Sequence, residues 1–271
     1  MLVEVLALTL LSLAFGLAAF NLATPSRELS GGFFALHGVL ALPALLLALV
    51  ASGRSGLVLR PVGGWPSPVL LTAVSVASLV LHTLLAHGGK LGAARLALLP
   101  GVVTLAMLLG SRASAAPFAG RGLGAGWLAA GLLLGGLLFG AVVWAMNLGH
   151  WYLVSKTLPF KLLVHGAEAF GALALLRALF VVAIVAVAVR SPGETGASTA
   201  RLLDLAGDGL FFWSRVLWGL AATVVLAPFV VKTARMKSNQ AATGLLYVGV
   251  VFVMIGELLS TYLTLRTGLP V

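Results

Sequence analysis

The chain has 271 residues, of which 61% are hydrophobic and 9% are charged. Soluble globular proteins carry roughly a quarter charged residues, so this composition excludes a soluble enzyme and a disordered protein. The formal net charge of +10 comes from 17 Lys+Arg that stand singly between apolar runs. A nucleic-acid-binding domain is also excluded, because such a domain clusters its basic residues on one face.

Eight apolar segments are long enough to cross a membrane as α-helices, which need about 20 residues each. We therefore expect an all-α, polytopic integral membrane bundle that forms a single domain over 1–271. The expected location is a bacterial inner or cytoplasmic membrane. The predicted spans are 2–23, 32–52, 68–89, 92–111, 126–148, 160–189, 210–231 and 244–265.

The loops after the first, third, fifth and seventh predicted helices lie on one face of the membrane, called the odd side below. The opposite face, with both chain ends, is called the even side. The Lys and Arg count is eight on the odd side against seven on the even side, so the positive-inside rule discriminates weakly. All five lysines lie on the odd side, and we expect that side to be cytoplasmic.

Segments 36–47 and 164–175 share a His-Gly pair, then Ala, then Ala-Leu-x-Leu at identical spacing. The helix before each segment ends in Asn-Leu. This pattern predicts two parallel four-helix halves, 1–115 and 116–271, related by an axis along the membrane normal. The alternative is chance matching of Leu and Ala in an apolar chain.

All five histidines are predicted to lie in the odd-side leaflet. At a rise of 1.5 Å per residue, His37 and His165 lie about 8 Å, and His82 about 10 Å, from the odd-side ends of their helices. His87 and His150 lie nearer the membrane surface. Each is a functional candidate, because ionisable side chains inside a bilayer are costly.

Three interpretations of this histidine layer stay open. His37, His82 and His165 are candidate axial ligands of a haem b. They are alternatively contacts of a quinone head group, with which imidazoles exchange hydrogen bonds and protons. In the third interpretation they only hydrogen-bond neighbouring helices. The His-Glu-x-x-His spacing of a zinc site is absent, so no metal-ligand set is predicted apart from the haem interpretation.

The densest polar and aromatic stretch of the chain ends the fifth predicted helix. His150 from this stretch, with His165 and Glu168 of the next helix, are the candidate catalytic residues. His165 and Glu168 are three residues apart and share a helix face, where a carboxylate beside an imidazole can handle protons. Asn147 and Tyr152 are candidates for orienting a cofactor head group. Interfacial anchoring is the alternative role of the aromatic side chains.

A second polar group is predicted deeper in the membrane. Arg215 and Glu257 match in depth on antiparallel neighbouring helices, and neither is stable as a lone charge in hydrocarbon. The sequence therefore predicts a buried ion pair whose role is more architectural than catalytic. Arg177, in the middle of the sixth helix, has no partner that the sequence identifies.

The leading hypothesis is a membrane subunit of a respiratory or photosynthetic electron-transfer complex that interacts with haem b or quinone. The alternative is a small-solute or ion transporter with Glu168, Arg177, Arg215 and Glu257 along its path. A second alternative is a structural anchor for partner subunits. Expected partners are membrane lipids and other subunits of a complex, and no nucleic acid. The basic loop 232–244 is a candidate contact for anionic lipid head groups.

Overall fold

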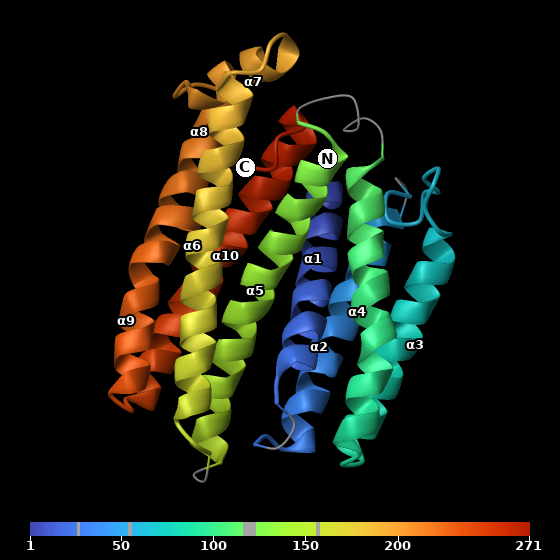
Figure 1. Ribbon diagram of the computed structural model, residues 1–271, viewed down its shortest axis with the longest axis vertical. Helices are drawn as coiled ribbons and strands as arrows, with labels where there is room; N and C mark the ends of the chain where they lie inside the picture. Colours follow the sequence, from blue (N-terminus) through green and yellow to red (C-terminus); the bar gives the residue numbers. More distant parts are fainter. Residues whose placement is uncertain (26–27, 54–55, 116–122, 156–157) are drawn as a thin grey trace.

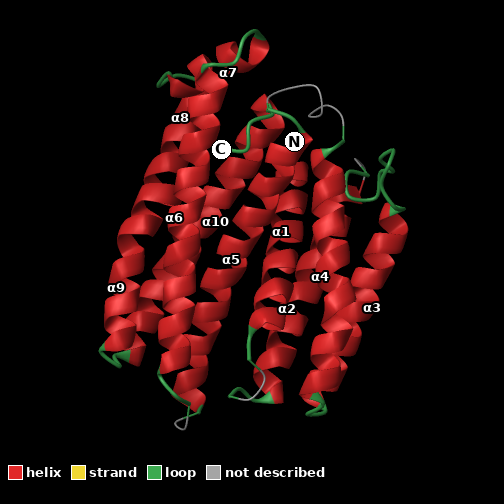
Figure 2. Cartoon of the chain, in the orientation of Figure 1, coloured by secondary structure: helices red, strands yellow, loops and turns green. Residues whose placement is uncertain are grey.

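The computed structural model is all-helical in the part of the chain that it describes, with no β-strand there (Figure 2). That part is the whole chain except residues 26–27, 54–55, 116–122 and 156–157, and the side chains of residues 153, 154 and 194 are also outside it. The prediction of a polytopic helical membrane bundle is confirmed, since eight spans in the described residues are long and apolar enough to cross a membrane.

The helices run up and down in chain order (Figure 1). The seventh span is one continuous rod formed by α8, the π-helical segment η2 and α9. The bounds of the spanning helices are α1 Leu2–Ala23, α2 Gly31–Ser52, α3 Pro68–His87, α4 Leu91–Ala113, α5 Ala125–Val154, α6 Lys161–Val189, α8 Asp208–Ser214, η2 Arg215–Ala222, α9 Thr223–Arg235 and α10 Asn239–Thr267.

One short helix, α7 (Glu194–Leu203), was not predicted. It lies at the end of the bundle that also holds both marked chain ends, which is the even side (Figure 1). The sequence windows missed it because ten residues with several hydroxyl and charged side chains do not resemble a membrane span.

Proline does not break the fourth span. Pro100 stands inside α4, where it cannot donate a backbone hydrogen bond. The next amide, of Gly101, donates to the Ser78 hydroxyl on α3 at 2.9 Å. In lipid every backbone donor needs a partner, so this bond from the neighbouring helix helps α4 to continue unbroken.

Two central helices, α1 and α5, organise the packing. On one side α2, α3 and α4 follow α1 in sequence, each packing on the one before, and α4 returns to α1. On the other side α6, α9 and α10 follow α5 in the same way, and α10 returns to α5. As a result α2 packs on α1 and α3 while α6 packs on α5 and α9, so α2 and α6 do not pack along each other.

Glycine lets the two central helices approach closely. A Cβ atom on Gly16 of α1 would fall on the backbone of Gly136, and one on Gly140 would meet the backbone of Gly16. Small residues at such crossings are the usual basis of tight helix packing in membranes. The outer faces of the bundle carry many exposed Leu and Val side chains, which contact membrane lipid.

Candidate functional site

The structure divides the predicted histidine layer into two groups. His37 on α2 and His82 on α3 are buried, and each is bonded to a neighbouring helix. His87, His150 and His165 are exposed. The pair proposed at matched depth, His37 and His165, therefore lies on helices that do not pack together, with one imidazole inside the bundle and the other outside it.

His82 joins three helices. Its Nδ1 lies 2.9 Å from the carbonyl oxygen of Ala94 on α4, which can only accept, so Nδ1 carries the proton. Its Nε2 accepts from Asn21 Nδ2 of α1 at 2.8 Å. The same Asn21 amide donates to the Phe34 carbonyl oxygen at 3.0 Å, while Asn21 Oδ1 is left without a partner. Both nitrogens of His82 are thus occupied by protein.

His37 is held in the same manner. Its Nδ1 donates to the Phe33 carbonyl oxygen one turn earlier at 2.9 Å, and its Nε2 lies 3.4 Å from the side-chain amide of Asn147 on α5. Asn147, expected to orient a cofactor head group, therefore contacts an imidazole. An axial haem ligand needs a free ring nitrogen, and in this arrangement neither His37 nor His82 offers one.

The other predicted site residues do not converge. Tyr152 is buried, donates to the Pro159 carbonyl oxygen at 2.6 Å and stacks on Phe160 with ring centroids 5.3 Å apart. Glu168 pairs with Arg235 of α9 at 2.7 Å instead of contacting an imidazole. His150 and His165 remain on the surface near the odd side. The described residues contain no group of three or more potential metal ligands.

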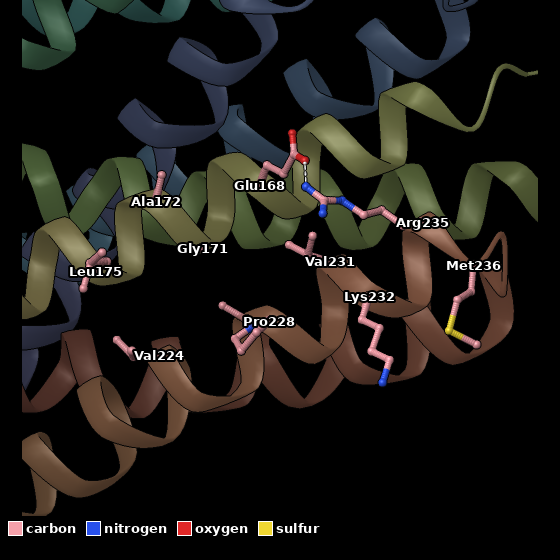
Figure 3. A pocket seen from close by; sticks show the side chains of 11 residues that line it. Glu168, Gly171, Ala172, Leu175, Val224, Pro228, Val231, Lys232, Arg235 and Met236 are labelled. Carbon is pink, nitrogen blue, oxygen red and sulfur yellow. Dashed lines mark hydrogen bonds and ion pairs between the residues drawn. The ribbon is translucent and has the colours of Figure 1, made fainter.

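Glu168 stands at a groove between α6 and α9 (Figure 3). The groove has a volume of about 690 Å³, with apolar walls from Leu175, Val224 and their neighbours and a polar end at Glu168, Lys232 and Arg235. The Arg235 guanidinium reaches across it to the Glu168 carboxylate (Figure 3). A second, almost wholly apolar groove of about 540 Å³ adjoins it at Val224 and continues along α6 toward the even side.

Three buried charged side chains form a cluster, called the charge cluster below. It consists of Arg177 on α6, Arg215 on η2 and Glu257 on α10, which are 1%, 0% and 7% exposed. Arg177 donates from Nε and Nη2 to the two carboxylate oxygens, both at 3.2 Å. Arg215 Nη2 donates to Oε1 at 2.9 Å. Arg177 Nη2 also donates to the Ser260 hydroxyl at 2.7 Å.

Three glycines make room for the charge cluster. A Cβ atom on Gly135 of α5 would collide with the Glu257 carboxylate, and one on Gly219 or Gly256 would collide with Arg215 Nη1. Arg215 and Gly219 both belong to η2. A π-helical turn shifts the register of the side chains that follow it, and such turns occur often at functional sites. Here the turn carries Arg215 against α10.

The charge cluster is not neutral, because two guanidinium groups share one carboxylate. Three of its buried nitrogens have no hydrogen-bond partner: Arg177 Nη1, Arg215 Nε and Arg215 Nη1. Native proteins rarely leave such donors unmet in a dry interior, and an excess charge there is costly. The cluster therefore needs a further explanation beyond an ion pair between helices.

Beside the charge cluster lies a cavity of about 10 Å³, lined by Arg177, Glu257 and several hydroxyl side chains. A second cavity of about 10 Å³ shares Leu132 and Thr264 with the first and reaches Leu57 and Arg112 at the even side. Each has room for about one particle of the size of water. The hydroxyl-bearing residues around the first cavity are Thr9, Ser12, Ser260, Thr261 and Thr264.

The sequence contained a signal for the partner of Arg177. Arg177 lies 12 residues from the even-side end of α6 and Glu257 lies 10 residues from that of α10. At 1.5 Å per residue the two depths differ by about 3 Å, which allows contact. By depth alone, Arg215 is an equally good partner for Glu257. Only the lateral arrangement of the helices shows that both arginines reach the same carboxylate.

No protein-family model, curated protein or solved structure matches this chain.

Proposed function

We propose that the protein moves a small anionic solute across the membrane, with the charge cluster as the binding point of its path. One observation carries the proposal: two arginines buried inside the bundle share a single carboxylate and keep three unpartnered donors. Buried charges in membrane helices mark ion or substrate pathways more often than they support packing.

The surroundings of the charge cluster favour entry of the anion from the even side. The two small cavities with their hydroxyl groups lie between the cluster and that face. Toward the odd side the path is closed by buried apolar side chains, including Val142, Phe170 and Val253. Passage to the odd side requires these side chains, which stand on α5, α6 and α10, to separate, so these three helices must move relative to one another. The matching packing order of the two halves supports the proposal that they are repeats.

The test is anion flux into liposomes that contain the purified protein, with the membrane voltage clamped and fluoride, chloride, nitrate and formate offered in turn. We expect flux well above that of empty liposomes for at least one anion. Arg177→Gln should lower it tenfold or more. The control, Lys161→Gln, alters a surface ion pair with Glu28 and should leave the flux unchanged.

Two results would overturn the transport proposal. One is that no anion crosses faster than in empty liposomes although the reconstituted protein is intact. The other is that Arg177→Gln transports as fast as the unmodified protein.

The second candidate is interaction with a quinone inside an electron-transfer complex, and the grooves along α6 favour it. They offer a long apolar channel for an isoprenoid tail, with Glu168, Lys232 and Arg235 at the odd-side end for a polar head group (Figure 3). Thermal stabilisation by a short-chain quinone, lost in Glu168→Gln with Arg235→Gln, would support quinone binding, and its absence would count against it.

A further inference from the structure

The cavity beside the charge cluster limits the size of the ligand that can bind there. We infer that it binds one monovalent, single-atom anion of the halide class in the cavity beside Arg177. This inference rests on the proposed transport function and names its substrate class. Such an anion neutralises the site, because two guanidinium groups, one carboxylate and one halide together carry no net charge.

Charge balance limits the number of bound anions to one. The described charged side chains that form ion pairs with Glu257 are Arg177 from α6 and Arg215 from η2. Toward Glu257, α5 presents Gly135 and α1 presents the hydroxyl residues Thr9 and Ser12, none of which carries charge. One excess positive charge is left, and one monovalent anion cancels it.

The donors around the cavity suit an anion better than a water molecule. Arg177 lines the cavity and has its Nη1 free of hydrogen bonds. Five hydroxyl-bearing side chains line the same space, of which Thr9 donates to Thr261 and Thr264 donates to the Leu269 carbonyl oxygen. The hydroxyl groups of Ser12, Ser260 and Thr261 can turn their hydrogens toward an anion. A hydrogen bond from a charged donor to an anion in a dry interior is far stronger than one to water. The guanidinium of Arg177 is also held in position, since its Cζ lies 5.7 Å from the centre of the Phe180 ring.

The size of the cavity fits fluoride, which is about as large as water, better than chloride or bromide, and it excludes polyatomic anions. A volume of about 10 Å³ accommodates one particle the size of water. Carboxylates, sulfate and phosphate have several heavy atoms and would need the Glu257 carboxylate or the backbone at Gly135 to move. Gly131, also on α5, is in contact with Pro270, which lines the same cavity and leaves no room to enlarge it on that side.

The test is the thermal stability of the detergent-purified protein as sodium gluconate is replaced by sodium fluoride, chloride or bromide at fixed ionic strength and pH. A ligand that binds only the folded state raises stability with the logarithm of its concentration. We expect a rise of about 3 °C for each tenfold increase in the best halide above its Kd, and no rise with sulfate.

Two variants locate the effect. Arg177→Gln removes the excess charge, and its stability should no longer depend on halide. The matched control is Arg95→Gln, because Arg95 is a half-buried arginine on α4 that lines neither cavity and donates to the carbonyl oxygen of Leu22. This variant should be less stable yet keep the full halide dependence. If Arg177→Gln does not fold, the isosteric Thr261→Val removes one hydroxyl from the cavity and should raise the Kd for halide several-fold.

The outcomes separate this inference from the transport proposal. Stability that ignores halide, that rises equally with sulfate, or that still responds to halide in Arg177→Gln overturns the halide site. Halide binding without flux in liposomes overturns transport and leaves the site standing. Flux of formate or nitrate without halide binding overturns the site and leaves transport standing.

Discussion

The two halves of the bundle bury polar groups in opposite ways. In the first half, His37 and His82 belong to a network in which both nitrogens of each ring are bonded to protein. In the second half, Arg177 and Arg215 share Glu257 and keep unpartnered donors. The burial is equally complete in both. The histidine network leaves one acceptor unmet, Asn21 Oδ1, whereas the charge cluster leaves three charged donors unmet. The difference teaches that charge balance and unmet donors, rather than depth, separate a polar group that joins helices from one that awaits a ligand.

The largest expected effect comes from removing the shared carboxylate. Glu257→Leu leaves two buried guanidinium groups without a counter-charge, and we expect a loss of about 3–5 kcal/mol in the free energy of unfolding. Chemical denaturation in detergent measures it. Glu168→Leu breaks an exposed pair and should cost about 1 kcal/mol or less. Equal losses in the two variants would show that the charge cluster is not electrostatically distinct.

A smaller effect is expected from crowding the charge cluster. Gly135→Ala places a methyl group on the Glu257 carboxylate, and such overpacking costs about 1–3 kcal/mol. It should also reduce anion flux, because the carboxylate must shift toward the cavity. Gly126→Ala on the same helix meets no neighbour within 4 Å and serves as the control. An unchanged melting temperature and flux in Gly135→Ala would contradict the geometry described for the cluster.

The hydrogen-bond network of His37 and His82 should affect the stability of the folded protein and not its anion transport. His82→Leu removes the bond to the Ala94 carbonyl and leaves one Asn21 hydrogen without a partner, which costs about 1–3 kcal/mol. We expect anion flux per folded molecule and halide-dependent stability to stay as in the unmodified protein. A specific loss of flux in folded His82→Leu would move the functional site into the first half of the bundle.

The smallest expected signal is optical. The two buried imidazoles have no free nitrogen, so the protein purified from its membrane should show no haem bands in a reduced-minus-oxidised spectrum. Bands that disappear in His37→Ala would instead establish the haem interpretation of the histidine layer. They would also require the Asn147 contact to rearrange on haem binding.

The sequence was most informative where the signal is local. The spans followed from runs of apolar residues, and even α4 was placed correctly despite Pro100. The depth argument also identified Arg215 with Glu257, because position along a helix follows directly from residue number. Depth was insufficient for the histidines: His37 and His165 match in depth, yet one side chain is buried and the other exposed.

The sequence by itself therefore determined the number of membrane crossings, the depth of each polar residue and the presence of excess positive charge. Only the tertiary structure decided which residues meet: that Arg177 joins Arg215 on one carboxylate, that Asn147 meets His37, and that Glu168 turns outward to Arg235. The physical reason is that lipid and protein interior are equally apolar. Hydrophobic periodicity, which reveals the buried face of a helix in water, does not mark the inward face of a helix in a membrane.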